Sequence, residues 1–518
     1  MRNASGEWMR LKGRRHGLEK RWKQYAAFTL PRLFTDENWD EDTDELAHDW
    51  QAVGAQAVNH LTNKVMLALF APSRPFMRLE ADAKWISNVQ AQGLDRSMID
   101  AALSQAELEA VRALDTIPGA RSKLYLVVSN LIVLGNVCMQ LPKEKGETPR
   151  VYNVAQYVVR RTGTGAVKQA IIRECLRFDE LEPEVQEAVK TSGAGQRFQP
   201  DTKVTYFRHI IRNEKGGYEL KQSIDSYELP DKFNGAWPDE ESLEYRFLTW
   251  NLKDGNNYGT GLVEDYRADF AGLSTLSEAQ IKGAVLASEF RWLVNPAGMT
   301  KVEDFENSEN GGALPGQEGD ISLVANSKPG DLQVIGAVVQ DYIQRIGRGF
   351  LLGSAVTRNA ERVTAEEIRM QAQELETSFG GTYSNIAMGI QLPMARWLLR
   401  NVNLDVNGTK IKIAIVTGLD ALSRSGDLDN LRAAMMDLVQ VGQLKQLIPE
   451  LNRKAVVQAI LAGHGLPEAK YLLSDQQVQA EQQAAQQAAI NAQTAQEAAS
   501  AGVQAGIQQG QQSAGQTS

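Results

Sequence analysis

The 518-residue sequence has only two cysteines, Cys138 and Cys175, and only five histidines. Two cysteines are too few for a disulfide framework, so we expect folding in a reducing compartment. The histidines, at positions 16, 48, 60, 209 and 464, have no metal-ligand spacing among themselves or with the cysteines. We therefore expect no metal and no cofactor, and we interpret His60 as a core histidine with a satisfied hydrogen bond.

Short motifs of catalysis are missing as well. No GK dipeptide occurs, so there is no Walker A loop, and neither GxSxG nor HExxH is present. We therefore do not expect an enzyme. Catalytic groups dispersed along the chain could still converge in space, and turnover with nucleotides or DNA would reveal them.

Positive charge is in deficit. The chain has 55 Lys and Arg residues against 64 Asp and Glu residues, a net charge of −9. Attraction to phosphates needs local positive charge, so any contact with DNA must use a few placed residues. The first 34 residues are locally basic, with nine Lys or Arg residues and two Glu residues.

Long hydrophobic runs are also lacking, with one borderline case. The stretch from Leu124 to Leu141 is 18 residues without a charge, the lower limit for a membrane span. Polar residues interrupt it, and each would need a partner in lipid. The N-terminus has no apolar core or cleavage site of a signal peptide. We predict a buried core helix in a soluble protein.

What is present is mainly helical, with a β-rich insertion. Apolar spacings of three and four predict helices at 14–28 and 50–72. Short β-branched and aromatic runs fill 151–252, and Gly216-Gly217 between two of them predicts a hairpin. We therefore predict a mainly α fold with inserted β-rich segments (α+β).

Helix signals return in the second half. The capping-box pair Ser277 and Gln280 predicts a helix that ends near Asn295-Pro296, before a glycine-rich stretch to residue 330. Further elements are predicted as a helix from 331 to 349, a long helix from 364 to 401 that bends at Gly380-Gly381 and at Pro393, a strand at 410–417, and helices between 427 and 473. The last 44 residues hold 15 Gln and 12 Ala, and are either disordered or helical beside copies of themselves.

The order helix, glycine-rich excursion, helix, polar loop and long helix resembles the portal, or head-to-tail connector, proteins of tailed bacteriophages. The similarity is greatest to the short-tailed, autographivirus-type connectors. It rests on WQAVGAQAVNHLTNKVMLALFAP at 50–72, YGTGLVEDY at 258–266 and RNAERVTAEEIRMQAQELE at 358–376.

The resemblance implies a subunit with a wing, a stem, a clip, a tunnel loop and a crown, assembling into a ring. The implied ranges are the wing at 1–270, the first stem helix at 271–294, the clip at 295–330, the second stem helix at 331–349, the tunnel loop at 350–362, a long wing helix and strand at 363–426, the crown at 427–474, and the Ala/Gln tail at 475–518 as a helical barrel or disordered.

The resemblance also points to site residues. Weak holds on DNA are expected from Arg358 and Arg362 in the tunnel loop and from Lys282, Arg345 and Arg348 on the stem. The alternatives are an exposed helix charge or an intersubunit ion pair for the stem residues, and a pair with Glu366 for Arg362. The acids of the proposed clip are either a solvated loop or a negative rim for tail adaptors: Glu303, Asp304, Glu306 and Glu309.

The implied function is a ring-shaped DNA conduit at one capsid vertex, used in genome packaging, tail attachment and DNA ejection. The implied partners are further copies of the chain (a homododecamer), non-specifically bound double-stranded DNA, terminase, tail adaptor and tubular proteins, capsid and scaffolding proteins, and internal core proteins. The protein would be assembled in the host cytoplasm and located in the virion. The alternative is a membrane-associated oligomeric assembly protein, based on the apolar 124–141 run and the basic N-terminal helix.

Overall fold

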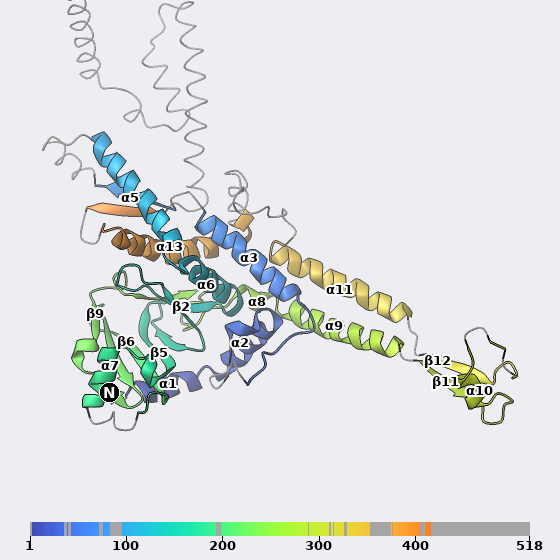
Figure 1. The fold of residues 1–518 in the computed structure, drawn as a ribbon. Helices are drawn as coiled ribbons and strands as arrows, with labels where there is room; N and C mark the ends of the chain where they lie inside the picture. Colours follow the sequence, from blue (N-terminus) through green and yellow to red (C-terminus); the bar gives the residue numbers. More distant parts are fainter. Residues whose placement is uncertain are drawn as a thin grey trace, which may run out of the picture. The chain divides into compact units, whose positions relative to one another are not determined.

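The structure is a computed structural model (Figure 1). It describes residues 3–35, 39, 43–71, 76–82, 96–192, 198–288, 290–309, 312–313, 315–325, 329–352, 374–375, 377–404 and 410–415. All of them belong to the first of the chain's two units, Met1–Leu419. The predicted tunnel loop from residue 353 onward, the predicted crown and the Ala/Gln tail lie outside the described residues.

Helices form most of the N-terminal part, as the sequence predicts. The helix predicted at 50–72 is α3, Val53–Leu69, and it buries Val58, Leu61 and Val65 on one face. The basic segment forms two helices, where one was predicted at 14–28. The elements of this part are α1 Ala4–Gly13, α2 His16–Phe28, η1 Pro31–Leu33, β1 Met77–Ala81, α5 Arg96–Thr116 and α6 Ala120–Leu134.

The apolar run at 124–141 is buried, as predicted, but it is not one helix. Helix α6 ends at Leu134, and Gly135 adopts the left-handed conformation with φ +71°. Strand β2, Asn136–Gln140, follows at once. A side chain at Gly135 would not fit, because its Cβ would lie 2.3 Å from the backbone nitrogen of Gly261. Continuous apolar runs do not distinguish a buried helix from a buried strand, which is why the sequence missed this turn.

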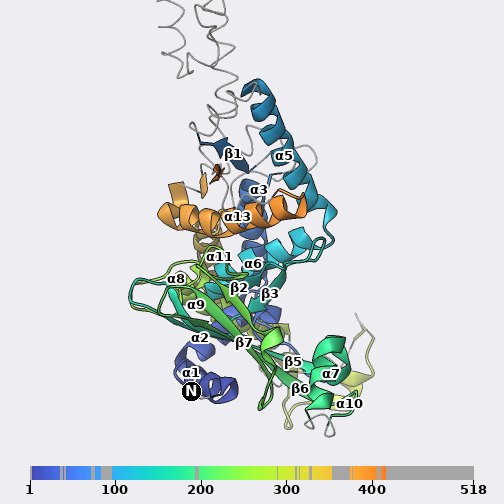
Figure 2. The same ribbon diagram turned by 90° about the vertical axis from the view of Figure 1, so that its left-hand side faces the viewer.

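Antiparallel strands fill the predicted β-rich segment. A six-stranded sheet has the order β4-β5-β6-β7-β8, with β9 paired to β7, and a second sheet has the order β10-β2-β3. Figure 2 labels β5, β6 and β7 of the first sheet and β2 and β3 of the second. The predicted hairpin at Gly216 joins β6 to β7, with φ +91° at that glycine. The elements are β3 Arg150–Asn153, β4 Tyr157–Arg161, β5 Val167–Arg177, η2 Phe178–Glu180, α7 Pro183–Thr191, β6 Lys203–Arg212, β7 Tyr218–Ile224, β8 Tyr227–Glu228, η4 Asp231–Phe233, β9 Gly235–Trp237 and β10 Tyr245–Thr249.

Two long helices flank a small β module in the second half. After α8, Leu262–Asp265, come α9 Arg267–Ser288, β11 Phe290–Val294, α10 Val302–Glu306, β12 Ile321–Ala325 and α11 Pro329–Gly349. The capping-box prediction at Ser277 is wrong, because α9 begins ten residues earlier and Ser277 lies inside it. The predicted end near Asn295 is also wrong, because β-branched and aromatic residues after Ser288 form β11, paired with β12.

The last described helix and strand contact elements from the first part of the chain. Helix α13, Gly381–Asn401, follows a break at Gly380, whose φ is +50°, and it contains Pro393 without ending there. Strand β13, Ile411–Ile415, is the strand predicted at 410–417, and it pairs with β1. A residue pair such as Met77 and Ile415 thus joins distant parts of the sequence.

One large core contains residues from α2, α3, α6, β2, α8, α9, α11 and α13, and a smaller core lies between α7 and the far end of the six-stranded sheet. No single described helix is long and apolar enough to span a membrane. Two segments, Ala102–Thr116 and Ala120–Leu134, meet the length and composition criteria only together, and they bend by 83° at the break between them.

The two cysteines are unpaired and occupy opposite environments. Cys138 on β2 is fully buried, and burial raises the pKa of its thiol well above the usual value. Cys175 on β5 is exposed. Both are free thiols, as expected of a protein without a disulfide framework.

Candidate functional site

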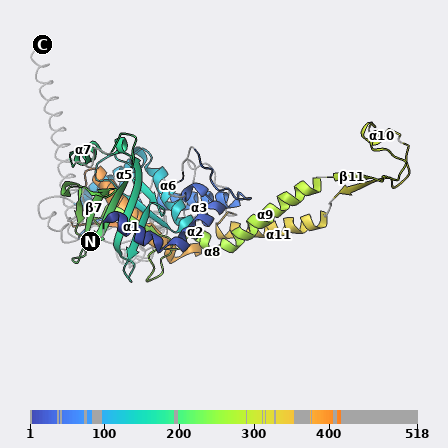
Figure 3. The ribbon, with the colours of Figure 1, turned by 90° about the horizontal axis from the view of Figure 1, so that it is seen from below.

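Helices α9 and α11 lie side by side, with the β11–β12 module beyond their shared end (Figures 1 and 3). Glycines allow their close approach. A Cβ at Gly272 would lie 2.8 Å from Cζ of Tyr342, and a Cβ at Gly349 would lie 2.2 Å from Cζ of Tyr266. The close approach of the two helices therefore depends on glycines that lie against tyrosine rings.

The other end of the helix pair is anchored in the large core. Phe350, fully buried, packs edge-on against Tyr266 and Phe270, with ring centroids 5.6 and 5.7 Å apart. Leu273 on α9 and Ile346 on α11 are also buried. Aromatic contacts of this kind fix the direction in which the two helices leave the core.

Towards the β module, both helices expose apolar side chains. Ile281 and Val285 are one turn apart on α9, and Val334 and Val338 are one turn apart on α11. Together with Leu286, these five residues are between 38% and 64% exposed. We call them the distal apolar residues. An apolar stripe on each of two packed helices is typical of a surface that another protein covers.

The predicted basic residues of the helix pair are exposed, and two of them have partners within the chain. Nζ of Lys282 lies 2.6 Å from Oε1 of Glu278, one turn earlier on α9. Nη2 of Arg345 lies 3.3 Å from Oδ1 of Asp269, so the acid beside it belongs to its own chain. Arg348 is exposed at the end of α11, and its side chain has no hydrogen-bond or ion-pair partner among the described residues.

Arg358 and Arg362 lie outside the described residues, but both ends of the segment that carries them are described. At the first end, helix α11 ends with two backbone hydrogen bonds. Leu352 N–H donates to Gly347 O at 2.7 Å, and Leu351 N–H donates to Arg348 O at 3.3 Å. This is a Schellman motif with leucine where glycine is usual. Leu351 has φ +56°, which costs a leucine on the order of 1 kcal/mol.

Two residues of α3 hold the carbonyl oxygen of that leucine. Nε2 of His60 lies 3.1 Å from Leu351 O, and Nζ of the buried Lys64 lies 3.0 Å from the same atom. Nζ of Lys64 is also 3.1 Å from Oε2 of Glu374, at the second end of the segment. The pKa of His60 is lowered by burial and then by the Lys64 charge, so the neutral ring donates its Nε2 proton.

The prediction that His60 has a satisfied hydrogen bond is thus confirmed, although the ring is half-buried and is not part of the core. Lys64 is a residue whose role sequence reasoning missed. A signal was available. Lys64 falls on the apolar stripe of the helix predicted at 50–72, where a lysine is out of place unless its ammonium finds acceptors.

The β11–β12 module carries the predicted acids on its surface. Glu303, Asp304 and Glu306 of α10 are exposed, as is Glu309 beyond it. The connecting loop is held by another acid.

That acid is Asp320, whose Oδ2 accepts N–H bonds from Met299 at 2.9 Å, from Thr300 at 3.1 Å and from Gln317 at 3.1 Å. These bonds lower the pKa of the Asp320 carboxyl, the one from Gln317 most of all.

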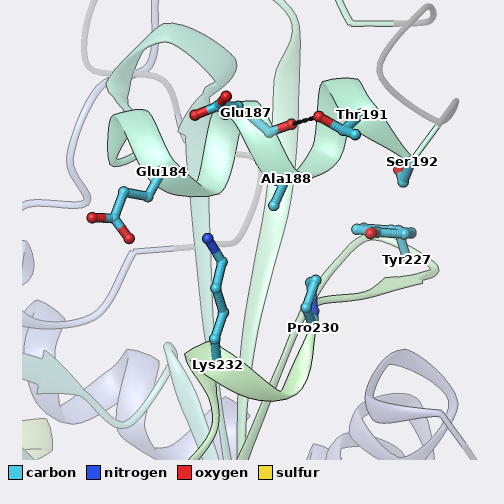
Figure 4. Close-up of a pocket in the computed structure, with 8 residues that line it drawn as sticks. All are labelled: Glu184, Glu187, Ala188, Thr191, Ser192, Tyr227, Pro230 and Lys232. Atoms are coloured by element: carbon cyan, nitrogen blue, oxygen red, sulfur yellow. Dashed lines mark hydrogen bonds between the residues drawn. The ribbon is translucent and has the colours of Figure 1, made fainter.

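Four pockets lined by described residues contain none of the predicted site residues. One of about 430 Å³ lies between α7 and η4, where Lys232 extends toward the helix (Figure 4). Its lining is Glu184, Glu187, Ala188, Thr191, Ser192, Tyr227, Pro230 and Lys232. Within the described part of the chain, no group of three His, Cys, Asp or Glu side chains could hold a metal ion. The distinctive features of the described residues are therefore a helix pair with an uncovered apolar face and the contacts of Lys64 with Leu351 and Glu374.

A family model described as bacteriophage head to tail connecting protein matches residues 2–472. The chain belongs to this family. The portal proteins of Enterobacteria phage T3 and Escherichia phage T7 are each 32% identical to this connector over 488 residues, which cover 92% of it and 89% of each relative. The portal protein of Pseudomonas phage phiKMV is 30% identical over 481 residues.

The connector's place is the head-to-tail connection of the phage particle, and the predicted portal role of an autographivirus-type connector is confirmed. Its family consists of structural connectors, and the membrane-associated alternative has no support among the relatives. Among solved structures, a chain in the neck of a native gene transfer agent particle is 12% identical with a TM-score of 0.36, over 80% of this connector and 90% of that chain. That likeness is too weak to add to the family assignment.

Proposed function

We propose that the connector assembles into a closed ring, a dodecamer, through which double-stranded DNA passes during packaging and ejection. The observation that carries this proposal is the set of distal apolar residues, which the chain leaves exposed on both α9 and α11. Burying one such half-exposed side chain stabilises an interface by on the order of 1 kcal/mol. The α9 stripe of one subunit would pack on the α11 stripe of the next, a head-to-tail contact that closes into a ring.

In this proposal α9 and α11 are the stem, and residues 290–325 are the clip that meets tail adaptors. The elements before α9, with α13 and β13, are the wing, and the segment from Phe350 to Arg362 is the tunnel loop. Residues 427–474 are the crown, and the Ala/Gln tail extends from it. The exposed α10 acids support a negative rim for basic adaptor surfaces.

Passage of DNA requires weak, non-specific contacts, because tight phosphate binding would act as a brake. The chain's net charge of −9 repels phosphates from the channel wall, and a few rings of Lys or Arg side chains around the channel would bind them transiently. Arg348 is the stem residue most available for this, since Lys282 and Arg345 already face acids of their own helix pair. Arg358 and Arg362 are the proposed tunnel-loop contacts. The terminase supplies the motor at this ring, and capsid, scaffolding and internal core proteins surround it.

The direct test is electron microscopy of the purified full-length chain. We expect closed rings with a central hole. A chain that stays monomeric at high concentration in near-native buffer would contradict the proposal. In phage, Arg358→Ala should leave ring assembly intact and reduce DNA packaging or retention. Loss of rings in that variant would instead make Arg358 a subunit-contact residue.

A further inference from the structure

A pocket of about 280 Å³ lies at the C-terminal end of α13, against the loop between β2 and β3. Its lining consists of polar and aromatic residues: Lys143, Lys145, Trp397, Arg400, Asn401 and Asn403. Three of these six side chains are positively charged, and no acidic residue is among them. The lining therefore suits an anion.

The guanidinium of Arg400 has no partner of its own. Its Nε is enclosed by the fold and has no hydrogen-bond partner. No hydrogen bond or ion pair joins the Arg400 side chain to any residue in the described part of the chain. An enclosed charged donor without an acceptor is costly, because it has lost water and gained nothing in exchange. An anion in the pocket would supply the missing acceptor.

Two further guanidinium groups make the surroundings of Arg400 more positive. Arg396 lies one turn earlier on α13, and Arg246 lies on the neighbouring strand β10. Burial lowers the pKa of Arg246 to about 10, and the charges of Arg396 and Arg400 lower it as well. The Nε of Arg246 is also enclosed and without a hydrogen-bond partner.

Nearby acids neutralise part of this charge from outside the pocket. Oε2 of Glu241 lies 2.5 Å from Nη2 of Arg396, and Oε1 of Glu244 lies 2.8 Å from Nζ of Lys143. The other acids of the region are exposed and do not line the pocket: Glu144, Glu147, Asp239 and Glu240.

Lys145 reaches the pocket from the loop. Its ammonium donates to Oδ1 of Asn403, and the N–H of Gly146 donates to Oδ1 of Asn401 at 2.9 Å, so the loop is joined to the end of α13. A cation at a helix C-terminus also stabilises the last carbonyl groups, which by itself would account for Lys145. It does not account for the enclosed, unpartnered Nε of Arg400.

We infer that this pocket binds a phosphate group, either free or carried by the backbone of DNA. One guanidinium and two ammonium groups offer more donors than the two oxygens of a carboxylate accept, and a phosphate brings a further oxygen and more charge. None of these residues belongs to the predicted channel or clip, so the inference stands apart from the proposed function.

The test is isothermal titration calorimetry of the full-length protein with inorganic phosphate at constant ionic strength. We expect one phosphate bound per chain. Arg400→Gln should weaken binding by about tenfold, because it removes a charged donor. Lys145→Gln, at an exposed position, should weaken it by about threefold. The matched control is Arg160→Gln, which changes an exposed arginine of β4 outside the pocket and should bind as wild type does.

A short duplex DNA distinguishes the two sources of phosphate. If the DNA backbone is the ligand, Arg400→Gln should weaken duplex binding by the same factor, and added phosphate should compete with the duplex. If only free phosphate enters, duplex binding should be the same in wild type and Arg400→Gln while phosphate binding differs.

Three results would overturn the inference. One is phosphate binding that is absent or equal in wild type and both pocket variants. Another is acetate binding as tight as that of phosphate, which would make the pocket a carboxylate site. The third is loss of self-association in Arg400→Gln and Lys145→Gln by light scattering, which would assign the pocket to a subunit contact. If Arg400→Gln fails to fold, Lys145→Gln decides between these outcomes.

Discussion

Nη1 of Arg15 lies 2.6 Å from the carbonyl oxygen of Tyr157, although 142 residues separate the two in the sequence. The same nitrogen is 2.7 Å from Val154 O, and the Arg15 guanidinium also lies over the rings of Trp8 and Trp22. Arg15 is only 2% exposed. The buried Arg15 cation thus joins the basic N-terminal segment to the start of strand β4.

Arg15→Met should lower the free energy of unfolding by about 3 kcal/mol, because two carbonyl groups lose a charged donor. Urea unfolding followed by circular dichroism would measure the loss. The control is Arg78→Met, whose pair with Glu80 is exposed on both sides and should cost about 0.5 kcal/mol or less. Equal losses in the two variants would show that Arg15 contributes no more than a surface charge.

Val285→Asp should abolish rings without unfolding the chain. Val285 is 54% exposed in the single chain, so a carboxylate there remains hydrated until a neighbour covers it. Burying it unpaired would cost several kcal/mol at every interface. Light scattering after size-exclusion chromatography should show monomers with a wild-type circular dichroism spectrum. Val285→Ile, which keeps the apolar surface, should still form rings; normal rings in Val285→Asp would place the interface elsewhere.

The sequence predicted the elements whose pattern is local and strong. The stripe of α3 and the Gly216 hairpin were read correctly, since periodicity and turn chemistry determine both. The N-terminal boundary of α9 was predicted wrongly. The Ser277 pattern usually begins a helix, but here it lies inside α9, because the buried Phe270 packs in the core and the helix extends towards the N-terminus to include it. The turn at Gly135 was missed for a related reason: tertiary contacts, not local pattern, make a strand of residues 136–140.

The candidate site could be predicted only in part. Charge and order along the chain located Lys282, Arg345 and Arg348 on two helices. The i,i+4 spacing of Glu278 and Lys282 was a signal for that pair, but the sequence did not show that Asp269 of α9 faces Arg345 of α11. A salt bridge between helices depends on their relative rotation, which one sequence does not specify. The exposure of the distal apolar residues is likewise a property of packing, since the same stripe read alone predicts core.

Asp320→Ala should loosen the loop of the β11–β12 module. Its carboxylate is the shared acceptor for the amides of Met299, Thr300 and Gln317, so their hydrogen exchange should accelerate by about tenfold. Asp304→Ala, on the exposed face of the same module, is the control and should leave those amides protected.

The same contact should depend on pH. The pKa of Asp320 is lowered in the folded protein from the ordinary 3.8, so the stabilisation is complete above that value and is lost as the pH falls through the lowered pKa. Protection of the Thr300 amide should therefore persist at pH 5 and disappear in stronger acid. Protection that is lost already near neutral pH would contradict this account of the loop.

His209 should make the fold sensitive to mild acid. It is 8% exposed on β6, and Gln169 Nε2 donates to its Nε2 at 2.8 Å, which requires a neutral ring. Burial lowers the pKa of His209 to about 4 from the usual 6.5. The unfolded chain takes up a proton first, so stability falls as the pH drops from about 6.5 towards 4.

The measurement is the free energy of unfolding of wild type and of His209→Gln at two pH values. Between about pH 7.5 and pH 4.5, wild type should lose about 2–3 kcal/mol more than the variant. His16→Gln, at an exposed histidine, should follow wild type. Parallel curves for wild type and His209→Gln would mean that the buried ring titrates normally.

The contrast between the two thiols offers a way to count subunits. A maleimide dye needs an accessible thiolate, which Cys175 on the surface of β5 can supply and the enclosed Cys138 cannot. Chains labelled before assembly would thus each carry one fluorophore at a known position. The number of bleaching steps from a single particle would then report its stoichiometry directly, without any symmetry imposed on an image.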